Sequence, residues 1–70
     1  MVRESVDSSE LCSIGYDENI LTLEVEFHRG GTYQYFGVTK DVYSNLMSAS
    51  SKGRYFNTTI KDAYAYHRVA

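Results

Sequence analysis

The chain has 70 residues with a formal net charge of −2, and 43% of its residues are hydrophobic and 23% charged. A chain of this length fits one small domain, because it buries only about 60% of its unfolded surface and needs most large apolar side chains for its core. The composition excludes a disordered chain, and no apolar run approaches the roughly 18 residues of a membrane-spanning helix. The single cysteine, Cys12, excludes an internal disulfide, and with no signal peptide in the sequence we expect a cytoplasmic protein.

Charge is distributed unevenly along the chain. Residues 1–39 hold two basic and seven acidic side chains, a net −5, whereas residues 40–70 hold five basic and two acidic ones, a net +3. The basic half offers a surface for an anionic partner, although a pI near 5.5 falls short of the balance of a dedicated nucleic-acid binder. The alternative interpretation is an ordinary solvated face with interspersed charges.

Two strands are predicted in the first part of the chain. Residues 1–8 are mainly charged and serine side chains, so we expect a flexible arm there and a single domain over residues 9–70. A short apolar stretch predicts a first strand over residues 9–16. Residues 21–28 alternate strictly between apolar and polar side chains, which is typical of a strand with one buried face. The polar face, which carries two glutamates, is expected to be solvated.

The glycine pair at 30–31 predicts a hairpin to a third strand, because glycine supplies the positive φ angles of a tight loop. The sequence leaves the hairpin register open. A two-residue loop pairs Val25 with Phe36 and leaves Tyr33 and Tyr35 on the wet face. A three-residue loop that also takes in the preceding arginine pairs Val25 with Tyr35, and both tyrosines then join the core.

Helical spacing of apolar residues predicts a main helix over residues 42–49, with Thr39 as its N-terminal cap. We expect Gly53 to end this helix in the left-handed conformation. Asn57 is placed to cap a second, shorter helix, and residues 66–69 form either a terminal strand or an extended tail. The sequence thus predicts an α+β domain in which a three-stranded antiparallel meander is covered on one face by a main helix and a second short helix.

One hydrophobic core is expected from the residues that follow these two periodicities. Its predicted members are Leu21, Leu23, Val25, Phe27, Val42, Leu46 and Ile60.

No pattern predicts catalysis or a metal centre. Cys12, His28 and His67 lack the spacing of a zinc site or of a known cysteine-nucleophile signature. We therefore expect a buried, inert cysteine, solvent-facing histidines, no cofactor and no enzymatic activity.

The order of these segments resembles the KTSC domain, a small module found alone in bacteria and at the C-terminus of some lysyl-tRNA synthetases. The likeness covers nearly the whole chain and rests on four stretches: Ile14-Gly15-Tyr16-Asp17, Leu23-Glu24-Val25-Glu26-Phe27, the central Tyr33-x-Tyr35, and Ala49-x-Ser51-x-Gly53-x-Tyr55-Phe56-Asn57. Thr39 stands where the family usually has proline, and both residues suit a helix start. The resemblance implies little about activity; RNA binding has been suggested for the family from its association with the synthetase.

The candidate binding residues are aromatic and basic. Rings on an open sheet face stack on unpaired bases, and Lys and Arg contact phosphate. The predicted binding residues are Tyr33, Tyr35, Lys52, Arg54, Tyr55 and Arg68. For the two tyrosines of the central strand, a place in the core is the competing interpretation.

The sequence therefore favours a small binding module that contacts RNA or a ribonucleoprotein. The alternative is a protein-interaction or oligomerisation module that pairs another chain with an exposed sheet edge.

Overall fold

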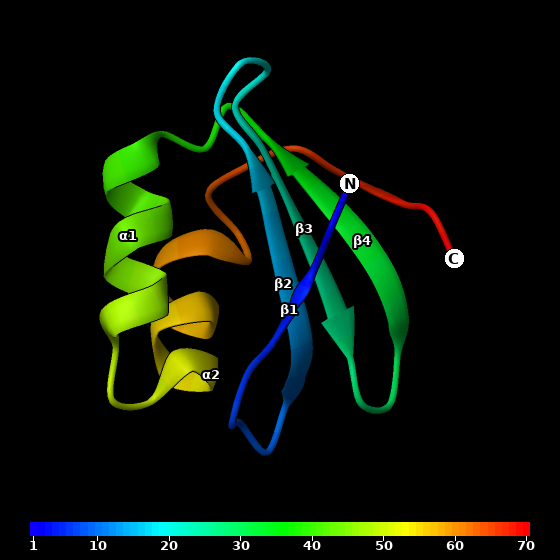
Figure 1. Cartoon of the computed structure of the whole chain (residues 1–70), viewed down its shortest axis with the longest axis vertical. Helices are drawn as coiled ribbons and strands as arrows, with labels where there is room; N and C mark the ends of the chain where they lie inside the picture. The colour runs from blue at the N-terminus through cyan, green and yellow to red at the C-terminus, as the bar shows by residue number, and fades with distance from the viewer.

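Helices and an antiparallel sheet form two layers in the computed structural model, which describes all residues from 1 to 70. The helices lie together on one side of the sheet (Figure 1). No helix has the length and apolar character needed to cross a lipid bilayer. In chain order the elements are β1 (Glu4–Ser5), β2 (Leu11–Asp17), β3 (Thr22–Phe27), β4 (Gly31–Phe36), α1 (Lys40–Ser48), α2 (Lys52–Tyr55), the π-helix η1 (Phe56–Ile60) and β5 (Tyr66–Arg68).

The sheet has five strands in the order β1-β2-β3-β4-β5, so the predicted α+β class is confirmed but the count of three strands is wrong. β1 and β5 hold only two and three residues, too few to show a period-two pattern in the sequence. β1 lies within the segment expected to be an arm and pairs Glu4 with Ile14 of β2. β5 resolves the alternatives for residues 66–69, because Tyr66 pairs with Tyr35 of β4.

The β3–β4 hairpin has a register that differs from both alternatives. Phe27 pairs with Gly31 and Val25 pairs with Tyr33, so the loop consists of residues 28–30. Only Gly31 of the glycine pair has a positive φ, at 84°. Tyr33 and Tyr35 still lie on the same face as Val25, as in the second alternative, because the two registers differ by an even number of residues.

The core fills the space between the sheet and the helices. Leu23 and Leu46, from sheet and helix, are both completely buried and belong to it as predicted. Leu21 is 40% exposed, because it ends the turn before β3 with a positive φ of 51° instead of forming part of the strand. Tyr35 and Phe56 join the core instead.

The helical region begins as predicted and then departs from the prediction. The Thr39 side chain accepts a hydrogen bond from the backbone N–H of Val42, which caps α1. Gly53 does not end α1 and has no positive φ; it lies inside α2, which Ser51 caps. Asn57 is not a helix cap either, because α2 continues directly into the π-helix η1. A π-helix has no sequence periodicity of its own that would have revealed it.

The outer face of the sheet, on the side away from the helices, carries a buried carboxylate. Glu24 is only 7% exposed, so the expectation of a solvated face is wrong at this position. Arg3 donates to Glu24 at 2.6 Å and to the Ser13 hydroxyl at 2.9 Å. Gln34 also donates to Glu24 at 2.8 Å, and Ser13 donates to Glu26 at 2.9 Å. The guanidinium and these donors compensate the cost of burying the charge.

The N-terminal residues 1–3 lie on this outer face of the sheet, against Gly15. In Figure 1 the chain before β1 crosses over the central strands. A Cβ atom at Gly15 would lie 2.7 Å from the carbonyl oxygen of Val2. Gly15 therefore lets the backbone of the segment lie directly on β2, which brings Arg3 over Glu24.

Arg3→Met should destabilise the fold by about 1–2 kcal/mol at neutral pH and weaken its response to acid. Burial alone would raise the pKa of Glu24, but hydrogen bonds from Gln34 and Arg3 outweigh it and hold the pKa below the ordinary 4.5. The hydrogen bond from Ser13 likewise lowers the pKa of Glu26. Groups with lowered pKa values stabilise the fold above their ordinary pKa, and this stability is lost as the pH falls through the folded values.

Urea unfolding between pH 7 and pH 3 measures the effect of Arg3→Met. Lys40→Met is the control, because its ion pair with Glu18, at 3.7 Å, joins two well-exposed side chains and should contribute at most about 0.5 kcal/mol. An acid response that is identical in Arg3→Met and the wild type would contradict the role of the Arg3–Glu24 pair.

Candidate functional site

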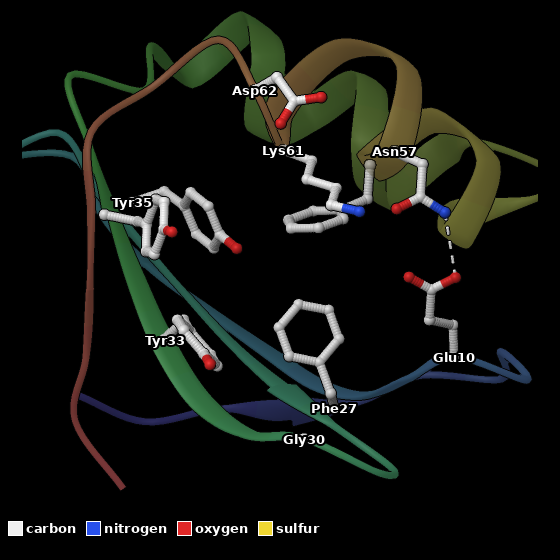
Figure 2. A pocket seen from close by; sticks show the side chains of 10 residues that line it. Glu10, Phe27, Gly30, Tyr33, Tyr35, Asn57, Lys61 and Asp62 are labelled. Carbon is white, nitrogen blue, oxygen red and sulfur yellow. Dashed lines mark hydrogen bonds between the residues drawn. The ribbon is translucent and has the colours of Figure 1, made fainter.

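Five aromatic rings surround a cavity of about 350 Å³ between the sheet and η1 (Figure 2). They form a closed circuit of neighbouring ring pairs. The centroid distances are 5.8 Å for Phe27–Tyr33, 5.9 Å for Tyr33–Tyr66, 5.6 Å for Tyr66–Tyr35, 5.2 Å for Tyr35–Phe56 and 5.3 Å for Phe56–Phe27. The volume lies at the low end of the roughly 300–1,000 Å³ that is usual for ligand pockets.

The five rings come from four elements of the fold. The alternation of β3 and β4 directs Phe27, Tyr33 and Tyr35 to the helix side of the sheet. β5 adds Tyr66, which is 61% exposed, and η1 adds Phe56, which is 1% exposed. The cavity therefore has a closed floor and an open mouth.

Polar side chains stand at the mouth of the cavity. They are Glu10, Asn57, Lys61 and Asp62. Asn57 Nδ2 donates to Glu10 Oε1 at 3.1 Å, across the gap between β2 and η1. Lys61 forms no ion pair, since the ion pairs of the chain involve only Arg3 and Lys40. The mouth thus combines two carboxylates, one ammonium and one amide.

A second, wholly polar groove adjoins the aromatic cavity. It runs between the β1–β2 loop and the start of α2 and holds the side chains of Lys52 and Arg54. Its lining also includes Glu10 and Asn57, so the bonded pair at the cavity mouth belongs to both hollows. The rest of the groove is lined by Asp7, Gly53 and four serines at positions 8, 9, 50 and 51. Its charged side chains are therefore two basic and two acidic ones.

Four of the six predicted binding residues line these two hollows. Tyr33 and Tyr35 line the aromatic cavity, and Lys52 and Arg54 line the polar groove. Lys52 Nζ also donates to the carbonyl of Ala49, at 3.2 Å, near the end of α1.

The two remaining predicted residues line neither hollow. Arg68, on β5, has its guanidinium carbon 5.9 Å from the centre of the Tyr33 ring and donates to the carbonyl of Ala70 at 2.9 Å. Tyr55 is half-buried and packs against the core.

Sequence reasoning missed most of the residues that complete the cavity. The sequence predicts Phe27 as a core residue, and it leaves the segment of Tyr66 open between a terminal strand and an extended tail. The polar residues of the mouth come from three separated parts of the chain, around positions 10, 57 and 61, and no local pattern connects them. The usable signals were the Tyr33-x-Tyr35 pattern, which predicted two of the lining rings, and the excess of tyrosine, seven in 70 residues.

The cysteine and the histidines do not form a site. Cys12 is half-buried, so the expectation of full burial is wrong, and a hydrogen bond to Glu26 raises the pKa of its thiol. His28 contacts the carbonyl of Ser8 at 3.0 Å, and His67 pairs with Gln34 in the sheet. No group of three or more His, Cys, Asp or Glu side chains is arranged to hold a metal ion.

Comparison with known proteins identifies the architecture. The KTSC domain model matches residues 7–64. A crystal structure of a KTSC domain protein from Yersinia pestis superposes with a TM-score of 0.97 at 43% identity, covering 99% of this chain and 97% of that one.

Sequence relatives fall into two kinds. An uncharacterised protein of Stutzerimonas stutzeri is 43% identical over 70 residues and is covered over 99% of its length, as is this chain. A lysine–tRNA ligase of Nostoc punctiforme is 33% identical over 64 residues, which cover 91% of this chain and 11% of the ligase. The same small unit thus resembles both a whole small protein and a minor part of a much larger enzyme.

The cavity tyrosine Tyr35 should ionise last among the tyrosines in a pH titration. Burial, followed by the charges of Tyr33, Tyr66 and Asp62, raises its pKa to about 12 from the ordinary 10.0. A raised pKa means that the neutral form is favoured by folding, so this stabilisation is present below pH 10 and is lost as the pH rises through the folded value.

Absorbance at 295 nm measures this ionisation directly. Tyr35→Phe should remove amplitude from the high-pH end of the titration, and the urea-unfolded wild type, in which the shift is absent, is the control. Loss of amplitude near pH 10 instead would contradict the burial of the Tyr35 hydroxyl.

Proposed function

The chain belongs to the KTSC domain family, and on that premise we propose that it is a non-enzymatic module that binds single-stranded RNA, alone or within a ribonucleoprotein. The observation that carries the proposal is the aromatic cavity with a polar groove directly beside it that holds Lys52 and Arg54. An unpaired nucleotide has the same two parts, an aromatic base and a charged phosphate.

The cavity suits a base because its walls are rings. Base–aromatic contacts contribute about 1–3 kcal/mol per base, and they tolerate many sequences because every base has a π face. Tyr66 and Tyr33 are the accessible rings, whereas Tyr35 and Phe56 form the buried floor. Tyr55 contributes by packing α2 against the core rather than by stacking.

The phosphate is assigned to the neighbouring basic side chains. Arg54 is exposed in the groove, and Lys52 stands beside it with one hydrogen bond to the end of α1. Arg68 donates to the carbonyl of Ala70 through its Nε alone. Its other N–H groups are therefore free to contact a second phosphate on the Tyr33 side of the cavity. A backbone that passes over the mouth therefore meets basic groups on both sides.

The lysine–tRNA ligase relatives support the same proposal. A lysine–tRNA ligase acts on a transfer RNA, and the shared segment is a small fraction of that enzyme. A module of this size adds affinity to a larger enzyme when it holds another part of the same RNA.

A sheet edge is less well suited to bind a protein partner. β1 pairs with two residues of β2 and β5 with three residues of β4. The long strands are thus partly covered at both edges of the sheet, and the outermost strands are only two and three residues long. Such short edges offer few backbone donors and acceptors to another chain.

RNA affinity should fall with salt, and replacing Lys52 and Arg54 together with glutamine should flatten the dependence by about one to two units. Each phosphate contacted on a single strand contributes a slope of about −0.7 in log K against log salt concentration. Fluorescence anisotropy of a labelled single-stranded RNA over a salt series measures the slope. Lys40→Gln, a basic residue outside both hollows, is the control for charge alone and should preserve most of the slope.

Tyr66→Ala should weaken RNA binding by about 1–3 kcal/mol without changing the salt slope, because the ring contacts a base and not a phosphate. Its 61% exposure and its place on an edge strand leave the core intact, which circular dichroism verifies. Absence of binding to RNA of varied sequence at low salt, together with a protein partner that persists after nuclease treatment, would refute the RNA proposal in favour of the interaction module.

A further inference from the structure

The mouth of the aromatic cavity is rich in hydrogen-bond acceptors. Glu10 and Asp62 present carboxylates, and Asn57 presents its side-chain carbonyl, because its nitrogen donates to Glu10. Asp62 takes part in no hydrogen bond or ion pair within the chain, so both of its oxygens are available. Lys61 is the charged donor of the mouth, and it is also without an ion pair.

Lys61 and Asp62 stand on one side of the mouth. They follow η1 directly in the chain, and Figure 2 shows both above the rings. Both residues line the cavity, so a charged donor and a charged acceptor are available on this side to the edge of a base held by the rings. The base that fits best is the one whose hydrogen-bonding edge complements the Lys61 ammonium and the Asp62 carboxylate.

Guanine complements it most fully. Its Watson–Crick edge carries two adjacent donors, N1–H and the N2 amino group, next to the acceptor O6. Two adjacent donors match the two oxygens of one carboxylate, and O6 then lies beside the ammonium. Adenine, cytosine and uracil each offer a carboxylate a single donor position flanked by an acceptor, which a carboxylate repels.

We propose that this cavity is selective for guanine, with the Asp62 carboxylate accepting from N1 and N2 and the Lys61 ammonium donating to O6. The inference rests on the proposed RNA-binding function and adds the identity of the base. Glu10 holds Asn57 in place and leaves the edge of the base to Asp62.

The test uses the wild-type protein and four labelled RNA pentamers, UUUUU, UUGUU, UUAUU and UUCUU, with a fifth that carries inosine in the centre. A bidentate contact discriminates between bases by about tenfold or more, so UUGUU should bind about tenfold tighter than the others. Inosine lacks the N2 amino group but keeps N1–H and O6, so its affinity should fall between guanine and uracil.

Asp62→Asn should abolish the preference for guanine while the affinity for UUUUU stays the same or rises, since a negative charge is lost. Asp41→Asn is the matched control, because Asp41 is exposed in the first turn of α1 and lines neither hollow. It should keep the full preference, and circular dichroism checks that both variants fold.

Equal affinity for all the RNAs would overturn the guanine assignment and leave the RNA proposal standing, whereas no binding to any of them would remove both. Inosine binding as tightly as guanine would also overturn it, since the N2 contact would then contribute nothing. Displacement of the RNA by millimolar arginine amide, with Asp62→Asn abolishing the displacement, would identify the cavity as a cation site instead.

Discussion

The left-handed backbone of Gly31 fixes the β3–β4 hairpin, and with it the face that every side chain of both strands occupies. A Cβ atom at this position would lie 2.8 Å from the Arg68 guanidinium and from the carbonyl of Ala70, besides the strain of its positive φ. A shift of one residue would move Tyr33 and Tyr35 to the outer face and Gln34 into the core. It would also remove the bond from Gln34 to the buried Glu24, so the cavity and the outer polar network depend on the same turn.

The same register explains why so many aromatic rings occur in so small a domain. A core of nine buried residues, mostly aliphatic, fills the space between the layers, and the rings gather where the sheet and η1 diverge. Their contacts are tilted or edge-to-face rather than parallel, with interplanar angles from 36° to 81° around the circuit. Tilted and edge-to-face contacts of this kind are the favoured geometry for packed rings, and the open side of the circuit is at Tyr66, which is 61% exposed.

Periodicity in the sequence was sufficient to predict the long strands, the cap at Thr39 and the buried positions Leu23, Val25, Leu46 and Ile60, because these depend on neighbours in the chain. It could not predict the burial of Glu24, whose partner Arg3 lies 21 residues away and is placed by a two-residue strand. The aromatic cavity could not be predicted either, because its rings are also far apart in the chain. Its rings come from β3, β4, β5 and η1, and only the tyrosines of β4 form a local pattern.

The burial of Glu24 also changes the electrostatic case for an anionic ligand. On a solvated face beside the tyrosines, Glu24 and Glu26 would repel phosphate. In the fold they lie on the outer face, opposite the rings, and Arg3 donates to one and stands 3.9 Å from the other. Arg3 therefore compensates one of these two negative charges locally, and the sheet separates both carboxylates from the cavity. The charges nearest the cavity mouth are those of Glu10, Lys61 and Asp62, together with Asp7, Lys52 and Arg54 of the adjoining groove.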